Sequence, residues 1–202
     1  EEPSYLATQV EEAGILNELH EKLSKSVSEQ MIADVQVGAF LSGGIDSSLI
    51  VALMQKNSMN TVKTFSIGFS DKEYDESHYA QKVSKILGTD HYELILSPDE
   101  LLKVVPRIKT IYDEPFADSS QVPTFLVSKL AVNEVSVCLS GDGGDEVFGG
   151  YNRYRWTNDV WSRMITLPLW LRKLISKIIS IPSEHRWKQI YSLIEFLLPL
   201  KY

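Results

Sequence analysis

The chain has 202 residues, of which 44% are apolar, 23% charged and 10% aromatic, an ordinary globular composition that excludes a disordered or fibrous protein. Its one cysteine, Cys138, excludes a disulfide scaffold and a cysteine-rich zinc site, and its four histidines show no HExxH spacing. The formal net charge of −7 makes nucleic acid a poor candidate partner, and no uncharged apolar run reaches the ~20 residues of a membrane span.

The charge is distributed unevenly along the chain. Residues 1–34 carry 2 basic and 8 acidic groups and residues 35–150 carry 9 and 16, whereas residues 151–202 carry 9 and 3. We interpret the basic part as solvated faces of amphipathic helices, with a phosphate-bearing ligand or a membrane surface as the alternative. The chain begins without Met and without a basic or strongly apolar leader, so we expect no signal peptide and either a fragment or a chain trimmed of a tag. The expected location is the cytoplasm.

Strands and helices alternate in the first half of the chain. Apolar residues at near-helical spacing predict a helix over residues 10–34. The continuous apolar run 37–41 predicts a buried strand of a parallel sheet, followed by a glycine-rich turn and a helix over 47–56. The β-branched and aromatic stretch 61–69 predicts the second strand.

The second half continues the alternation. Asp75 is predicted to cap a helix that ends before Gly88, and Ser97 with Glu100 has the pattern of a capping box. The predicted elements are a helix to Leu87, a strand over 91–96, a helix over 97–112, a loop over 113–121, a helix over 122–133, a strand over 135–139, an apolar helical stripe from Leu167 to Ile179, and a last helix from about Ser183 after Pro182.

This alternation predicts an α/β fold with a doubly wound parallel sheet. We expect one domain over residues 1–155 and a helical extension of it over 156–202. Ligands of such sheets bind beyond the carboxyl ends of the strands, at the switch point, and two glycine-rich loops follow apolar strands here.

The first loop has the layout of a phosphate cradle. Its glycines permit close approach, and backbone N–H groups at the start of a helix hold anions. Asp46 would repel a bare phosphate, which favours a metal ion between the carboxylate and the phosphate. The Walker lysine is absent, and the alternative is a plain turn with Asp46 capping the helix. The string is Leu41-Ser42-Gly43-Gly44-Ile45-Asp46-Ser47-Ser48.

The second loop places several carboxylates between glycines, directly after a buried strand. If the first and fourth strands are neighbours, Asp46 and Asp145 face each other and can share Mg²⁺ bound to a triphosphate. The alternative is a solvated acidic turn. The string is Leu139-Ser140-Gly141-Asp142-Gly143-Gly144-Asp145-Glu146-Val147-Phe148-Gly149-Gly150-Tyr151.

The first string resembles the pyrophosphate-loop (PP-loop) motif of ATP pyrophosphatases, and the second resembles the signature of the synthetase domain of glutamine-hydrolysing asparagine synthetases. Further matches are Asp34-Val-Gln-Val-Gly-Ala-Phe, Thr64-Phe65-Ser66-Ile67-Gly68-Phe69 and Asp113-Glu-Pro-Phe-Ala-Asp-Ser-Ser120. The resemblance covers residues 11–155. It implies a Rossmann-like sheet of the adenine nucleotide alpha hydrolase type, with about five strands in the order 3-2-1-4-5 and C-terminal helices.

The resemblance also implies roles for individual residues. The pyrophosphate end of ATP is held by Ser42, Gly43, Gly44, Asp46, Ser47 and Ser48. The adenosine is lined, largely through backbone groups, by Leu41, Ile67, Ser140 and Gly141. Asp46 and Asp145 ligate Mg²⁺, and Asp142 approaches the substrate or the attacking amine. The implied catalytic residues are therefore Asp46, Asp142 and Asp145, although many family members carry Glu at the position of Asp142.

The implied reaction activates the side-chain carboxylate of aspartate as an acyl-adenylate with ATP, releasing pyrophosphate, and ammonia then attacks to give asparagine. In the family the ammonia comes from a glutaminase domain with a leading cysteine, and homodimers are common. This chain starts with glutamate, and the family's catalytic lysine is not recognisable in it. The alternatives are an amidotransferase acting on a sugar, peptide or β-lactam precursor, a PP-loop RNA-modifying enzyme, and a non-catalytic nucleotide-binding or partner-binding module.

Overall fold

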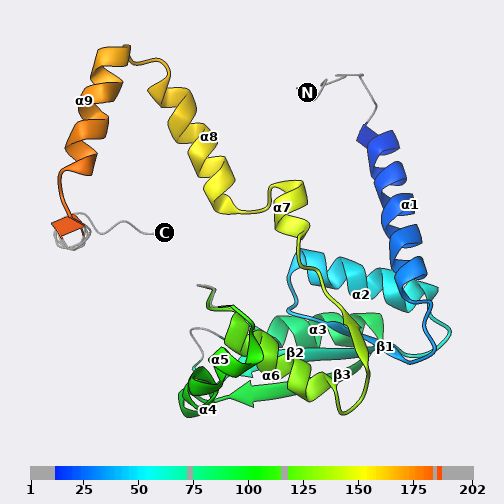
Figure 1. Cartoon of the computed structure of the whole chain (residues 1–202). Helices are drawn as coiled ribbons and strands as arrows, with labels where there is room; N and C mark the ends of the chain where they lie inside the picture. The colour runs from blue at the N-terminus through cyan, green and yellow to red at the C-terminus, as the bar shows by residue number, and fades with distance from the viewer. Residues whose placement is uncertain (1–11, 72–74, 115–117, 184–185, 188–202) are drawn as a thin grey trace. The chain divides into compact units, whose positions relative to one another are not determined.

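The computed structural model describes residues 12–71, 75–114, 118–183 and 186–187. Its described residues form one parallel sheet of four strands in the order β3-β2-β1-β4 (Figure 1). The strands are β1 (Val37–Phe40), β2 (Lys63–Phe69), β3 (Asp90–Leu96) and β4 (Val137–Leu139). In the register, Ala39 of β1 lies opposite Thr64 of β2 on one side and Leu139 of β4 on the other. The predicted α/β class is confirmed, and so is the order 3-2-1-4 of the expected sheet.

One face of the sheet packs against α2 (Ile45–Asn57) and α3 (Ser77–Leu87), and the C-terminal part of α1 (Glu12–Gln30) packs on α2. Successive side chains of a strand point to opposite faces, so Ala39 and Leu41 share one face with Val51 and Met54 of α2. All four are almost completely buried. Helix α1 contributes Val27 to this core, whereas the apolar residues near its start, such as Leu16, are exposed.

The opposite face packs against α4 (Pro98–Val104) and α6 (Gln121–Ala131). Phe65 of β2 is fully buried there together with Ala131, and further along the strand Ile67 packs beside Leu96 and Leu126. The sheet is therefore covered on both faces, as expected for a doubly wound parallel sheet.

The long helix predicted over residues 97–112 is wrong in its extent. Its start is confirmed, because Ser97 Oγ accepts the N–H of Glu100 at 3.4 Å and Glu100 Oε2 accepts the N–H of Ser97 at 2.8 Å. The helix α4 stops at Val104, a 3₁₀ turn covers Val105–Arg107, and α5 (Ile108–Ile111) follows. Pro106 has no N–H to donate to the preceding turn, which accounts for the interruption.

The chain divides into two compact units, residues 1–145 and residues 146–202. The short helix α7 (Gly144–Phe148) begins in the second glycine-rich loop, where the sequence predicts only a turn. The second unit continues with α8 (Asn152–Met164) and α9 (Leu169–Ser180). Pro168 precedes α9, so Leu167 of the predicted stripe lies outside the helix, and most of the last predicted helix lies outside the described residues. Among the described helices, none combines the length and the apolar character that crossing a membrane requires.

Candidate functional site

The first loop leaves the carboxyl end of β1 and leads straight into α2. Leu41 anchors its start, because its side chain is buried and its backbone N–H donates to the carbonyl of Phe65 at 2.9 Å. Gly44 is the N-cap of α2, and no side chain caps this end of the helix. A helix start without a side-chain cap leaves backbone N–H groups and the positive end of the helix dipole for an anion.

Hydroxyl groups fix the shape of this loop. Ser42 Oγ and Ser47 Oγ are hydrogen bonded at 2.9 Å, and Ser42 Oγ also accepts the N–H of Gly44 at 3.3 Å. Ser47 is buried and its hydroxyl donates to the carbonyl of Gly44 at 3.3 Å. Ser48 Oγ is buried without a hydrogen-bond partner among the described residues. The hydroxyls of Ser42 and Ser47 therefore hold the loop in one shape, which preorganises its backbone.

Gly43 cannot be replaced within this shape. Its φ of +83° is in the left-handed region, and a Cβ there would lie 2.5 Å from the backbone N of Ala80 and 2.6 Å from the backbone carbon of Tyr79. The loop is therefore packed backbone to backbone against the first turn of α3. This contact has no signal in the sequence beyond the glycine itself.

The second loop lies directly against the first. A Cβ on Gly141 would be 2.6 Å from the backbone N of Ser47, and a Cβ on Gly144 would be 2.6 Å from Asp46 Cγ. The neighbouring positions of β1 and β4 bring these glycines to the same edge of the sheet. The glycines of the second loop thus leave room for the backbone and the carboxylate of the first.

The half-buried carboxylate of Asp46 lies beside Gly144, the residue before Asp145. The described residues contain no group of three or more His, Cys, Asp or Glu side chains placed to hold a metal ion. Mg²⁺ takes only one or two carboxylates from a protein and fills its other positions with water and phosphate oxygens. Asp46 supplies one such carboxylate beside the uncapped start of α2, and Asp145 follows in the chain directly after the glycine that Asp46 contacts, so the chemistry of these residues fits a magnesium–phosphate group.

Asp142 is exposed and is held within its own turn. Ser140 Oγ donates to Asp142 Oδ2 at 3.0 Å and accepts the N–H of Asp142 at 3.3 Å. No hydrogen bond or ion pair among the described residues ties Asp142 to Asp46. The side chain thus lies at the surface of the second loop and is exposed to solvent.

The two apolar residues expected to line adenosine have their side chains in the core. Leu41 is 1% exposed, and Ile67 packs against the cluster of Leu96, Val104 and Leu126. The side chain of Leu41 is therefore closed to a ligand, whereas that of Ile67 is half-buried.

The prediction that Asp75 is the N-cap residue of α3 is wrong. The N-cap of α3 is Glu76, and Asp75 Oδ1 instead accepts the N–H of Ser77 at 3.1 Å and that of Phe69 at 3.2 Å. Sequence reasoning missed this link to the end of β2. The available signal is Gly68, whose missing side chain makes room for the carboxylate.

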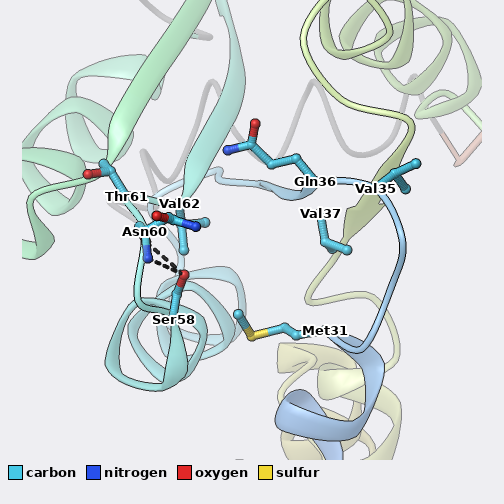
Figure 2. A pocket seen from close by; sticks show the side chains of 8 residues that line it. All are labelled: Met31, Val35, Gln36, Val37, Ser58, Asn60, Thr61 and Val62. Carbon is cyan, nitrogen blue, oxygen red and sulfur yellow. Dashed lines mark hydrogen bonds between the residues drawn. The ribbon is translucent and has the colours of Figure 1, made fainter.

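A cavity of about 160 Å³ lies at the opposite, amino-terminal end of β1 and β2 (Figure 2). Met31, Gln36, Asn60 and Val62 are among the residues that line it. Ser58 Oγ at its edge is engaged with Asn60, donating to the carbonyl at 2.7 Å and accepting the N–H at 3.1 Å. None of the predicted site residues lines this cavity, so the candidate site is the pair of loops at the carboxyl ends of the strands.

Comparisons with known proteins give the same family as the resemblance of the two loops. A family model described as "Asparagine synthase" matches residues 18–197. The chain is 36% identical over 181 residues to asparagine synthetase [glutamine-hydrolyzing] 1 of Bacillus subtilis, covering 90% of this chain and 28% of that protein. It is 41% identical over 169 residues to a putative asparagine synthetase [glutamine-hydrolyzing] 2 of Methanocaldococcus jannaschii, covering 81% and 32%.

The chain thus spans about a third or less of the length of these relatives. Among solved structures, it is similar to an NH₃-dependent NAD synthetase from Campylobacter jejuni, with a TM-score of 0.46 and 17% identity over 67% of this chain and 60% of that one. It is also similar to an NMN synthetase from Francisella tularensis, with a TM-score of 0.47 and 16% identity over 68% and 59%.

Proposed function

Because the chain belongs to the asparagine synthase family, we propose that it is the ATP-using part of an amide-forming ligase. ATP is held between the two glycine-rich loops, and the side-chain carboxylate of aspartate is activated as an acyl-adenylate. Ammonia then attacks this intermediate and gives asparagine and AMP. The contact between Asp46 and Gly144 is the observation that carries the proposal, because it places the carboxylate of the first loop beside the backbone of the second.

The start of α2 receives the pyrophosphate in this proposal. Its backbone N–H groups and helix dipole stabilise the negative charge that develops as pyrophosphate departs. The hydrogen bond between Ser42 and Ser47 and the packing of Gly43 on α3 keep these groups in place before ATP arrives. A preorganised loop needs no rearrangement at the moment of reaction.

Asp46 and Asp145 would hold Mg²⁺, which, when bound, supplies positive charge to the phosphate oxygens. Asp142, exposed on the second loop, is assigned to the approach of the substrate or the amine. Holding the carboxylate and ATP next to each other converts an encounter in solution into a reaction between bound groups.

We further propose that residues 1–155 are the ATP-binding synthetase domain and residues 156–202 its helical extension. The relatives are named glutamine-hydrolyzing and are far longer than this chain, which supports a glutaminase domain elsewhere in the parent protein as the ammonia source. We also propose that the parent protein is cytoplasmic and forms a homodimer.

The experiment is ATP–pyrophosphate exchange with Mg²⁺, performed on the parent protein with each of several carboxylates. Exchange that depends on aspartate is the expected result, because the adenylate forms reversibly before ammonia attacks. Exchange that depends on a sugar acid or a peptide, and not on aspartate, would instead support an amidotransferase that acts on that substrate. Absence of exchange with every amino acid would contradict the asparagine assignment.

A further inference from the structure

The half-buried side chain of Asp75 joins the carboxyl end of β2 to the start of α3. Its Oδ1 accepts the N–H of Phe69, the last residue of β2, at 3.2 Å. The same oxygen accepts the N–H of Ser77, the first residue of α3, at 3.1 Å. One carboxylate oxygen therefore fixes the relative position of a strand end and a helix start.

The surroundings of this oxygen are closely packed. A Cβ on Gly68 would lie 2.9 Å from Asp75 Oδ1 and 2.5 Å from Ile95 Cδ1, and Ser77 is only 5% exposed. The hydroxyl and N–H of Ser77, together with the N–H of Phe69, hold the pKa of Asp75 below its ordinary value. The side chain is thus a carboxylate at neutral pH, with donors on two elements.

The helix turn that Asp75 anchors also supports the first glycine-rich loop. The backbone of Tyr79 and Ala80 packs against Gly43: a Cβ on Gly43 would be 2.5 Å from the backbone N of Ala80. Tyr79 belongs to the same turn, since its N–H donates to the carbonyl of Glu76 at 2.9 Å. A shift of this turn must therefore move Gly43 or break its packing.

We propose that Asp75 is a positioning residue for ATP: it couples Phe69, at the end of the strand that carries Ile67, to the turn of α3 that supports Gly43. It thereby fixes the adenosine half of the nucleotide site relative to the pyrophosphate half. Asp75 itself is assigned no contact with the nucleotide. The inference rests on the proposed function, because it takes both halves to belong to one ATP site.

The simpler view is that Asp75 only stabilises the start of α3. That view predicts a loss of folding stability without a specific loss of nucleotide affinity. The positioning role predicts a loss of affinity larger than that of an equally destabilised variant. Glu134, whose carboxylate is paired with Lys63 at the amino-terminal end of the sheet, offers the matched comparison.

The test compares Asp75→Ala, Asp75→Asn and Glu134→Ala with the native protein. Calorimetric titration with ATP in the presence of Mg²⁺ gives Kd, and circular dichroism gives Tm. We expect Asp75→Ala to weaken ATP binding by about 10-fold or more, equivalent to about 1.4 kcal/mol of binding free energy. Asp75→Asn keeps an Oδ1 acceptor for both N–H groups and is expected to stay within about threefold of the native Kd. Glu134→Ala is expected to lower Tm without changing Kd.

If Asp75→Ala does not fold, Asp75→Ser replaces it, since a hydroxyl is too short to reach both N–H groups and should still weaken ATP binding. Binding by Asp75→Ala or Asp75→Ser within about threefold of the native Kd would overturn the inference alone. Equal losses of affinity in Asp75→Ala and Glu134→Ala at equal Tm would overturn it as well. A native protein that binds no ATP would overturn the proposed function and this inference with it.

Discussion

The carboxylate of Asp46 lies against the backbone of Gly144: a methyl group on Gly144 would be 2.6 Å from Asp46 Cγ and 2.9 Å from each carboxylate oxygen. The two residues are far apart in the sequence and meet because β1 and β4 are paired. This contact leaves no room for a side chain at residue 144. It also places the carboxylate of Asp46 beside the residue that precedes Asp145 in the chain.

Gly144→Ala is expected to displace the carboxylate of Asp46, because the carboxylate is the closest group to the new methyl. We expect activity in ATP–pyrophosphate exchange to fall on the order of 10- to 100-fold, as for other displacements of about 1 Å in an active site. The readout is the exchange rate as a function of Mg²⁺ concentration.

The control for this variant is Val147→Ala, on the same short helix, where the side chain is mostly exposed. It should leave the exchange rate close to native. A native Mg²⁺ dependence in Gly144→Ala would show that the position of Asp46 does not matter for exchange.

Gly43→Ala and Gly88→Ala form a matched pair. Both glycines have positive φ, +83° and +69°, so each substitution introduces backbone strain of about 1–2 kcal/mol. A Cβ at Gly88 meets nothing within 4 Å, whereas one at Gly43 collides with the backbone of α3. Overpacking adds about 1–3 kcal/mol to the cost at Gly43. Denaturant unfolding measures both free energies, and equal losses would contradict the packing of the loop on α3.

His91 gives the fold a pH dependence at mildly acidic pH. Its Nδ1 is 2.9 Å from Thr64 Oγ1 and its Nε2 is 3.2 Å from Ser66 Oγ, and both hydroxyls belong to buried residues of β2. Burial lowers the pKa of His91 below its ordinary value of 6.5, against a smaller opposing effect of the Glu93 charge. The unfolded chain therefore binds more protons below that value, so the free energy of unfolding falls as pH drops from 6.5 through the pKa of the folded state.

The measurement is denaturant unfolding between roughly pH 7 and pH 5, where histidine is the side chain that ordinarily titrates. His91→Gln keeps a polar side chain but does not titrate, and it should remove most of the decline. The carboxylates with lowered pKa, such as Asp75 and Glu100, lose their contribution only below their ordinary values of 3.8 and 4.5. A decline that is unchanged in His91→Gln would assign the pH dependence to other groups.

Local patterns in the sequence predict the main elements of the fold. The alternation of apolar strands and helices predicts the parallel sheet, and the capping box at Ser97 predicts the start of α4 to the residue. The end of that helix was less predictable, because the apolar spacing continues past Pro106 whereas the α-helical conformation of the backbone ends before it. Helix α7 was missed because glycines and acidic residues indicate a turn, whereas the structure forms a short helix there.

The candidate site was predictable in its residues but not in its packing. The glycine-rich strings identify the two loops, and the neighbouring strands explain why the loops meet. The support of Gly43 by Ala80 and the bridge from Asp75 to Phe69 join segments that are separate in the sequence, so no local pattern encodes them. Gly43 and Gly68, which leave space for backbone or carboxylate where a side chain would be, are the traces of these two contacts in the sequence.

The most direct test of the account is Mg²⁺-dependent binding of ATP by the native protein and by Asp46→Asn. The substitution keeps the size of the side chain and removes the charge that would ligate the metal. We expect the native protein to bind ATP only with Mg²⁺. Asp46→Asn should lose more affinity than the roughly 10- to 100-fold typical of losing an outer-shell partner of a metal ligand. Equal affinity of the two proteins, with or without Mg²⁺, would contradict a metal–nucleotide site between the two loops.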